Sequence, residues 1–351
     1  MISLDDEQAL RAADPSGLLD GFLSIPDQLA DAYGTAAARR DLAPDAAVEG
    51  VVLCGMGGSA AAADVVAALI RPAATVPVVV VRGTTLPAWA AGRTLVVCVS
   101  YSGNTDETLT CYAEARRRGC PTIAVATGGS LRAAAERASA LFVTLPGTAS
   151  MPRAGLGELT GALLGVIGAT GIDRPGEGHL GEAVETLRRT AAELAPGAAS
   201  ERNEAKDVAS WVGDRIPVAW GSEGLTEPLA VRWKAAFNEN AKVPAMASVL
   251  PELGHHEVVG WTAAWGRRFA LVVLRASDEQ PSLSRRLEAT LDVVSDAGLE
   301  HREVRGRGAS RLAQVLSVAL IGDVASAYHA LMRGIDPTPI EAIDRIKDRL
   351  R

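Results

Sequence analysis

The sequence predicts an α/β protein with two doubly wound parallel-sheet domains flanked by helices, and three observations support this fold class. Short β-branched runs alternate with alanine-rich helical patterns between residues 50 and 145. These strand-like runs are hydrophobic along their whole length, which is typical of strands covered by helices on both faces. A similar strand–turn–helix pattern restarts near residue 217, and 351 residues are enough for two cores.

The first half of the chain shows this pattern most clearly. The expected strands are Val51–Cys54, Val76–Arg82, Leu95–Val99, Thr122–Ala126 and Ala140–Leu145. The helices expected between them are Ala60–Ile70, Asp106–Arg118 and Ser130–Ala138. Such sheets bind ligands at the carboxyl ends of their strands, so the turns that follow these strands are the first places to look for a site.

The second half repeats the pattern less regularly. Two helices, Leu156–Ala169 and Gly181–Leu194, lead to a candidate boundary at Ala195–Ser200. Beyond it we expect strands at Pro217–Trp220 and Phe269–Leu274, a helix that ends at Ala241, and helices at Leu283–Ala297 and Arg311–Met332. We therefore predict one domain over residues 1–200 and a second over residues 201–351.

Composition excludes several classes of function. A net charge of −7 argues against binding to a nucleic-acid backbone, which depends on clustered Lys and Arg. The acidic N-terminus lacks an apolar stretch of signal-peptide length, and no run approaches a membrane span, so we expect a cytoplasmic protein with no membrane partner. Cys54 and Cys98 lie in apolar runs and are expected to be buried thiols, and no Cys/His cluster has the spacing of a metal site.

A glycine-rich turn follows the first expected strand. It reads Gly55-Met56-Gly57-Gly58-Ser59-Ala60 and satisfies the G-x-G-x-x-G/A dinucleotide fingerprint between a strand and a helix. The acidic residue that usually follows about 20 positions later would fall near the end of the second strand, where Arg82 stands. An arginine there is compatible with NADP, so this turn leaves a nicotinamide enzyme as one alternative.

A hydroxyl-rich turn follows the third expected strand. Asn104 and Glu107 have the spacing of a capping box, so a helix is expected to start there and to offer an anion site at its N-terminus. Neutral hydroxyl donors can hold a phosphate dianion without a buried lysine. The residues predicted to bind phosphate in the two turns are Gly57, Gly58, Ser59, Ser100, Ser102 and Thr105.

The sequence also resembles a known family. GMGGSA followed by SYSGNTDET resembles the SIS (sugar isomerase) domain, and the remaining chain resembles the bifunctional phosphoglucose/phosphomannose isomerases. The stretches that carry the second resemblance are Pro152–Ala154, Trp233–Lys242, Pro251–Glu257 and Gly334–Glu341, in the family's order. The resemblance implies two SIS domains, a homodimer, and cofactor-free conversion of fructose 6-phosphate into glucose 6-phosphate, mannose 6-phosphate or both through an enediol.

The same resemblance assigns roles to four residues. Glu239 is implied as the proton-transfer base, His255 as the ring-opening residue placed at the neighbouring subunit's site, and Arg153 as the cation that stabilises the enediolate. From spacing alone, Glu239 would be interpreted as a surface partner of Lys242 and Arg153 as an exposed arginine. The family often has Asn-His-Asn where this chain has Gly254-His255-His256, so the choice between His255 and His256 stays open.

The fourth residue, Lys347, has support from the sequence itself. Thr338-Pro339-Ile340-Glu341 has the form of a capping box with proline at the first helical position. The apolar face of the following helix contains Ile340, Ile343, Ile346 and Leu350, and Lys347 falls between Ile340 and Ile343. A lysine there either snorkels to solvent or is partly buried over a site, and the resemblance implies a catalytic lysine.

Two other functions remain possible at this point. SIS domains also serve as sugar-phosphate sensors that bind ligand without turning it over, although the combination of four catalytic candidates disfavours this alternative. An NADP-linked oxidoreductase that uses the Gly55–Ala60 turn is the other. The sequence does not rank glucose 6-phosphate against mannose 6-phosphate, because the two substrates differ only at C2.

Overall fold

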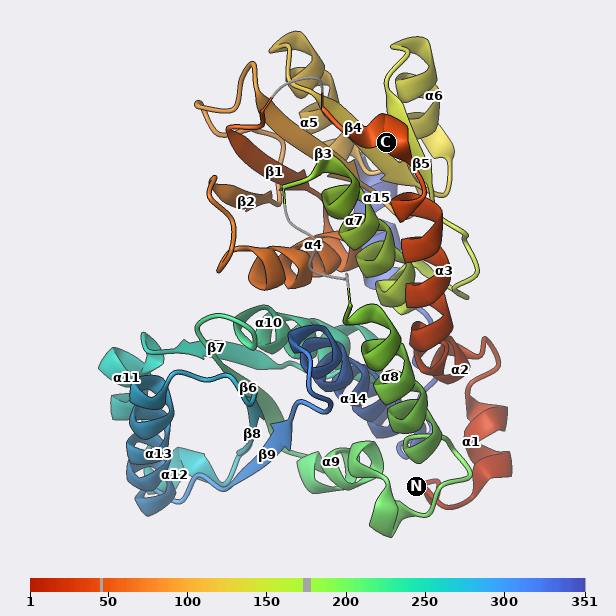
Figure 1. Cartoon of the computed structure of the whole chain (residues 1–351). Helices are drawn as coiled ribbons and strands as arrows, with labels where there is room; N and C mark the ends of the chain where they lie inside the picture. Colours follow the sequence, from red (N-terminus) through yellow and green to blue (C-terminus); the bar gives the residue numbers. More distant parts are fainter. Residues whose placement is uncertain (45–46, 173–177, 351) are drawn as a thin grey trace. The chain divides into compact units, whose positions relative to one another are not determined.

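The computed structural model describes residues 1–44, 47–172 and 178–350, with the side chain of Leu350 outside the described part (Figure 1). The chain divides into two compact units. The five-stranded unit contains Ser24–Arg188 and Gly308–Ala313, and the four-stranded unit contains Met1–Leu23, Arg189–Arg307 and the chain from Gln314 onward. Both are α/β units with parallel sheets, which confirms the predicted fold class.

The sheet of the five-stranded unit has the order β2-β1-β3-β4-β5, and all of its strands are parallel. Its strands are β1 (Gly50–Cys54), β2 (Val78–Val81), β3 (Thr94–Val99), β4 (Thr122–Ala126) and β5 (Leu141–Thr144). All five lie where the hydrophobic runs predicted them. The central strands β1, β3 and β4 are buried along their full length, as expected for strands covered on both faces.

Helices cover both faces of this sheet (Figure 1). They are α3 (Ile25–Ala37), α4 (Gly57–Ile70), α5 (Asp106–Arg117), α6 (Gly129–Arg137) and α7 (Leu156–Thr170), with short helical turns η1 (Arg40–Leu42) and η2 (Pro152–Ala154). Helices α5 and α6 share one apolar cluster with β1, β3 and β4, whereas α4 packs with α7. The change of face between α4 and α5 places the topological switch point between β1 and β3.

Helix α3, which the sequence pattern did not predict, packs along α7 through a row of glycines. A Cβ atom on Gly157 would lie 2.5 Å from the carbonyl oxygen of Ile25, and one on Gly161 would lie 2.5 Å from that of Leu29. Real Cβ atoms essentially never come this close, so glycine is required for the approach of the two helix backbones. The glycines that make α7 a weak helix former by propensity therefore have a packing function.

The four-stranded unit has the strand order β7-β6-β8-β9, again all parallel. Its strands are β6 (Ile216–Ser222), β7 (Met246–Leu250), β8 (Phe269–Arg275) and β9 (His301–Arg305). The sequence predicted β6 and β8 but missed the two edge strands. β9 reads HREVR, with only Val304 buried, because an edge strand can expose one face and so needs no apolar run.

The helices of this unit include its longest one, α14 (Arg311–Leu331). The remaining helices are α1 (Glu7–Ala13), α2 (Leu18–Leu23), η3 (Ser200–Arg202), α9 (Glu204–Val212), α10 (Glu227–Ala236), η4 (Phe237–Ala241), α11 (Leu253–His256), η5 (Glu257–Gly260), α12 (Ala263–Gly266), α13 (Pro281–Asp296) and α15 (Glu341–Leu350). Helix α8 (Leu180–Glu193) connects the two units along the chain. By length and composition α14 could cross a membrane, but its apolar stretch is 100% buried, as in a core helix.

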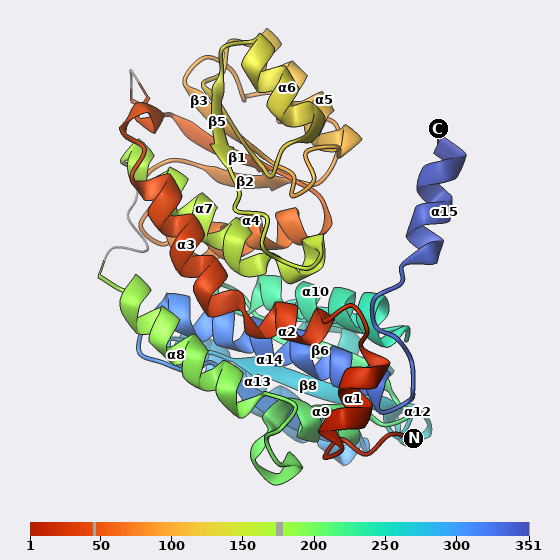
Figure 2. The ribbon, with the colours of Figure 1, turned by 90° about the vertical axis from the view of Figure 1, so that its right-hand side faces the viewer.

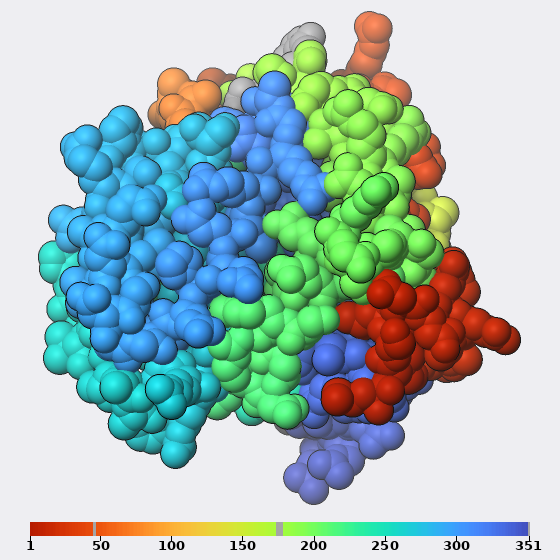
Figure 3. Space-filling view, turned by 90° about the horizontal axis from the view of Figure 1, so that it is seen from below, coloured from red at the N-terminus to blue at the C-terminus, as the bar shows by residue number. Residues whose placement is uncertain are grey.

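The N-terminal residues belong to the four-stranded unit, not to the N-terminal domain expected over residues 1–200. Asp5 Oδ1 accepts hydrogen bonds from the backbone N–H and the hydroxyl of Ser200, at 2.9 and 2.8 Å. The fully buried Lys206 ammonium donates to the carbonyl oxygens of Pro196 and Ala198. The N-terminal segment, red in Figure 3, therefore lies beside the green segment around residue 200, which also joins this unit.

All four cysteines are buried and free, as the apolar context of Cys54 and Cys98 predicted. Cys54 and Cys98 are register partners on the neighbouring strands β1 and β3. The contact with Cys111 lowers the pKa of Cys54, but the contact with Cys98 and desolvation outweigh it and raise that pKa overall. The contact with Cys54 and desolvation raise the pKa of Cys111. These thiols therefore stay neutral and act as small apolar side chains of the core.

Candidate active site

The first predicted phosphate turn joins β1 to α4. Gly57 adopts a φ of 52°, and a Cβ on Gly55 would lie 3.1 Å from the carbonyl oxygen of Val99, so both positions favour glycine. The first turn of α4 contains no acidic residue, so nothing there opposes an anion at the positive end of the helix dipole. The Oγ atom of the buried Ser59 accepts the N–H of Tyr101 at 3.2 Å, which ties this turn to the second one.

The second predicted turn joins β3 to α5. The hydroxyl oxygens of Ser100 and Thr105 lie 2.9 Å apart, and Ser100 Oγ also accepts the N–H of Gly103 at 3.1 Å. Gly103 has a φ of 71°, and a Cβ there would lie 1.9 Å from the carbonyl oxygen of Gly128, so only glycine fits. Because β1 and β3 are neighbours, the hydroxyls of both turns gather at one edge of the sheet, at its switch point.

The capping box expected from Asn104 and Glu107 does not form. Helix α5 starts where predicted, but its N-cap residue is Thr105, which makes no side-chain capping bond. The Asn104 Oδ1 atom instead accepts the N–H of Ser130 at 2.9 Å, in the first turn of α6. The spacing was misinterpreted because a cap was assumed to serve its own helix, whereas Asn104 connects two neighbouring turns.

Arg153 lies in η2, beside the first turn. A Cβ on Gly58 would approach the carbonyl oxygen of Pro152 to 3.4 Å and the Cα of Arg153 to 3.7 Å, so η2 packs against the start of α4. The Arg153 side chain is half-buried. The structure therefore brings the backbone of Arg153 next to the first predicted phosphate turn.

Glu158, which sequence reasoning missed, organises this side of the unit. Its carboxylate is fully buried and accepts the N–H groups of Gly147, Thr148 and Ala149 at 2.8, 2.7 and 2.8 Å. It also accepts the hydroxyls of Thr148 at 2.7 Å and Tyr101 at 3.4 Å. The signal in the sequence was a single charged residue inside the otherwise apolar helix Leu156–Thr170.

Tyr101 links this carboxylate to the phosphate turns. Its backbone N–H donates to Ser59 and its hydroxyl donates to Glu158. Its ring covers Gly155, where a Cβ would come within 2.5 Å of Cε2. Burial raises the pKa of the Tyr101 hydroxyl, and the neighbouring negative charge of Glu158 adds to this effect, so the hydroxyl stays a hydrogen-bond donor.

Glu239, the proposed base, lies in the four-stranded unit on η4, which is a π-helical turn that continues α10. Its half-buried side chain lines an open cavity of about 490 Å³. The other lining residues are Asn238, Lys242, Pro339, Ile340, Glu341, Ala342 and Ile343. Such π-helical turns are frequent at functional sites.

An ion pair is buried near Glu239. Arg232 on α10 donates two hydrogen bonds to Asp323 on α14, at 3.1 and 2.5 Å. Burial raises the pKa of Asp323 to about 6; Arg232 opposes this rise, and the negative charge of Glu239 adds to it. The next residue of η4, Asn240, donates to Ser326 of α14 at 2.9 Å, so α14 holds the π-turn in place.

The other two predicted catalytic residues do not line the cavity beside Glu239. His255 lies on the short helix α11, exposed, with Nε2 3.5 Å from Arg286, and the exposed His256 lies 3.6 Å from Glu252. Lys347 is 59% exposed and lies 3.8 Å from Asp344. Of the two alternatives left open for Lys347, the structure shows the solvent-exposed one, and it does not decide between the two histidines.

The reason for the exposure of Lys347 is the position of its helix. Helix α15 extends away from the sheet and the other helices of its unit (Figure 2), and its residues 341–349 are all exposed. It begins at Glu341, two residues later than a cap at Thr338 predicts, and the Thr338 N–H donates to Asp336 Oδ1 at 2.8 Å. The apolar side chains Ile343 and Ile346 are consequently open to solvent, at 38% and 59% exposure.

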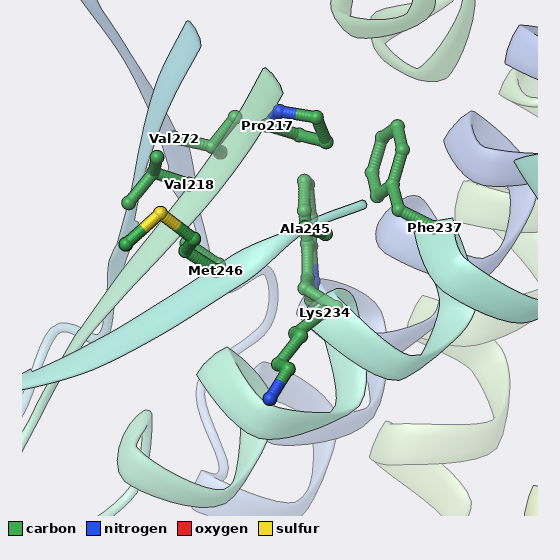
Figure 4. Close-up of a pocket in the computed structure, with 9 residues that line it drawn as sticks. Pro217, Val218, Lys234, Phe237, Ala245, Met246 and Val272 are labelled. Carbon is green, nitrogen blue, oxygen red and sulfur yellow. The ribbon is translucent and has the colours of Figure 1, made fainter. Parts of the chain in front are cut away.

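A second cavity in this unit is too small for a sugar. It measures about 10 Å³, which is room for about one water molecule. Figure 4 shows that its lining is mostly apolar, with Pro217, Val218, Met246 and Phe237 around it. Among the described residues there is also no group of three or more His, Cys, Asp and Glu side chains suited to a metal ion.

Comparisons with known proteins agree with this architecture. The family model for the bacterial phospho-glucose isomerase C-terminal SIS domain matches residues 201–350. A crystal structure of a hypothetical protein from Thermus thermophilus superposes with a TM-score of 0.73 at 18% identity, covering 98% of this chain and 94% of that one. At such low identity this similarity shows the fold alone.

Two curated relatives are closer in sequence, and both are named bifunctional phosphoglucose/phosphomannose isomerase. The one from Caldicellulosiruptor bescii is 32% identical over 337 residues, covering 95% of this chain and 98% of the relative. The one from Aquifex aeolicus is 32% identical over 314 residues, covering 89% of this chain and 92% of the relative. Because these matches run along nearly the whole of both chains, the protein belongs to the bifunctional phosphoglucose/phosphomannose isomerase family.

Proposed function

We propose that the protein interconverts fructose 6-phosphate with glucose 6-phosphate and mannose 6-phosphate through an enediol, with Glu239 as the proton-transfer base. The observation that carries the proposal is the Glu239 carboxylate on the wall of a cavity of about 490 Å³. This volume lies in the range of small-molecule sites. Family membership supports the same reaction class.

In this proposal each residue has a separate task. The carboxylate of Glu239 removes the proton from C1 of the ketose and returns it to C2, while the hydroxyl proton moves from O1 to O2, so that the aldose forms with no net oxidation. The turns that contain Ser59, Ser100, Ser102 and Thr105 bind the phosphate, and Arg153 stabilises the negative charge of the enediolate. No step requires a nucleotide or a metal ion.

The proposal includes a homodimer in which His255 of each subunit opens the sugar ring at the other subunit's site, and in which Lys347 also acts. The exposure of His255 and of the apolar residues Ile343 and Ile346 supports a contact with a second copy. Sedimentation velocity would detect a dimer. A strictly monomeric protein with full activity would rule out the shared site.

The test of the reaction is a spectrum of fructose 6-phosphate incubated with the protein, without nucleotide and with EDTA present. NMR should show the growth of glucose 6-phosphate and mannose 6-phosphate signals. Binding of substrate with no aldose signal would instead establish a sugar-phosphate sensor. Thermal stabilisation by NADP but not by a hexose 6-phosphate would favour the oxidoreductase that the Gly55–Ala60 fingerprint suggests.

A further inference from the structure

The segment between α14 and α15 has few hydrogen-bond donors of its own. Residues 336–339 read Asp-Pro-Thr-Pro, so two of the four lack an N–H group. The N–H of Thr338 is used locally, in its bond to Asp336. The carbonyl oxygens of Pro337 and Pro339 must therefore find donors on another element or in solvent.

Lys242 supplies donors to both of these carbonyls. Its ammonium nitrogen lies 2.9 Å from the carbonyl oxygen of Pro337 and 2.6 Å from that of Pro339, and it also donates to the carbonyl oxygen of Glu239. An ammonium group has three N–H donors, so one side chain can serve all three carbonyls. The same side chain thus contacts the proposed base and the segment that precedes α15.

The backbone at Lys242 is unusual for a lysine. It ends the π-turn in the left-handed conformation, with φ 56° and ψ 37°, which residues other than glycine rarely adopt. Glycine would fit this position with less strain, so the lysine side chain is the feature to explain. A second contact lies nearby, because Arg333 donates to the carbonyl oxygen of Ala241 at 3.3 Å.

We propose that Lys242 is a positioning residue whose ammonium fastens residues 332–340, the C-terminal strap, to the π-turn that carries Glu239. This inference rests on the proposed function, because it gives Lys242 a role in orienting the proposed base. By binding the carbonyl of Glu239, Lys242 fixes the backbone from which the carboxylate projects. By binding Pro337 and Pro339, it also holds the part of the cavity wall formed by residues 339–343.

The strap also has a consequence for Lys347. Helix α15 makes its connection to the rest of the unit through the strap, so the contacts of Lys242 set the direction in which α15 leaves. Loss of the ammonium should free both the strap and the root of α15, while the sheet stays intact. Proton transfer depends on sub-ångström placement of the base, so its rate should fall more than substrate affinity does.

The experiment compares Lys242→Met and Lys242→Gly with the full-length wild-type protein. Met keeps the aliphatic stem, whereas Gly also relieves the left-handed backbone, so an effect shared by both variants belongs to the ammonium. Lys234→Met is the matched control, since Lys234 is an exposed lysine on α10 outside the cavity beside Glu239. The measurements are hydrogen exchange of peptides covering residues 332–345, and kcat and KM for fructose 6-phosphate.

Both Lys242 variants should exchange residues 332–345 at least about tenfold faster, while peptides of β6 and β8 keep their protection. Their kcat should fall about tenfold with KM changed less than about twofold, and Lys234→Met should behave as wild type. Unchanged exchange in residues 332–345 would overturn the strap. Faster exchange with unchanged kcat would overturn the positioning role. Wild-type protein without isomerase activity would instead refute the proposed function, and the exchange result would still decide the strap.

Discussion

In each sheet the first strand leads through a turn into the N-terminus of a helix, but the two turns differ in chemistry. In the five-stranded unit, β1 enters α4 through glycines and Ser59, and no acidic residue lies in the first helical turn. In the four-stranded unit, β6 enters α10 through Gly221–Gly224, and Thr226 Oγ1 accepts the N–H of Ser222 at 2.8 Å. There the turn satisfies its own donors, and the acidic Glu223 and Glu227 lie beside it.

The difference teaches that an anion site does not follow from the fold alone. Both junctions offer a helix N-terminus at a topological switch point. Only the first leaves acidic side chains out of the first turn of its helix. The four-stranded unit instead presents a carboxylate, Glu239, in an open cavity.

The two units also stabilise buried carboxylates in different ways. Glu158 has only neutral donors among the partners described above, whereas Asp323 has the guanidinium of Arg232. Backbone N–H groups hold a charge without a second charge to desolvate, and an ion pair must desolvate both partners. The following predictions test these two contrasts.

The largest effect on stability should come from Glu158→Ala. Removal of the carboxylate leaves the N–H groups of residues 147–149 and the Thr148 hydroxyl without their acceptor. Each orphaned donor costs about 1–3 kcal/mol, so we expect a loss of about 4 kcal/mol or more in the free energy of unfolding by urea. A loss below about 1 kcal/mol would show that Glu158 does not organise this loop.

Asp323 should make stability depend on pH. Its pKa is raised to about 6, so the folded state binds its proton more tightly than the unfolded chain does. The raised pKa contributes up to about 3 kcal/mol to the free energy of unfolding. This contribution is fully present below about pH 4 and is lost as the pH rises through 6. The difference in the free energy of unfolding between wild type and Asp323→Asn, measured with urea between pH 4 and 8, should therefore change with pH. A difference independent of pH would contradict the raised pKa.

The side-chain hydroxyls of the predicted phosphate turns should control the affinity for the substrate phosphate. Thr105→Val and Ser102→Ala each remove one hydroxyl, and a bond to a charged ligand is worth about 1.5–3 kcal/mol. We therefore expect the KM for fructose 6-phosphate to rise about tenfold or more, with little change in kcat. Ser222→Ala, in the corresponding turn of the other unit, is the control and should leave KM unchanged.

The smallest effect should come from Lys347→Ala, measured as stability. Its ammonium is mostly exposed and its contact with Asp344 is a surface pair, so the free energy of unfolding should change by less than about 0.5 kcal/mol. A fall in kcat at unchanged stability would agree with the catalytic role implied by the family. A large loss of stability would instead reveal contacts of α15 in the assembled protein.

These contrasts explain what the sequence could predict. The strands of the first sheet were predictable because full burial demands continuous apolar runs, and β4 has the predicted bounds, Thr122–Ala126. The positions of Ser59 and Ser100 followed from those strands. Each of these features depends on neighbours within a few residues along the chain.

Features that depend on distant partners were not predictable in this way. The acceptor role of Glu158 requires a loop ten residues away to fold over it, and the close approach of α3 and α7 requires glycines to face a helix that the pattern missed. The π-turn that carries Glu239 was also not predictable, because sequence patterns assume regular α-helices. Exposure and partial burial both stayed open for Lys347, because the sequence does not show whether the apolar face of its helix packs against a core.

The most direct test of the account is a comparison of turnover and binding in Glu239→Gln. The variant keeps the shape of the side chain but cannot accept the substrate proton, and the phosphate turns belong to the other unit. We predict that kcat falls at least about 10³-fold, while calorimetry shows a Kd for fructose 6-phosphate within about twofold of wild type. Turnover near the wild-type rate would contradict the assignment of Glu239 as the base.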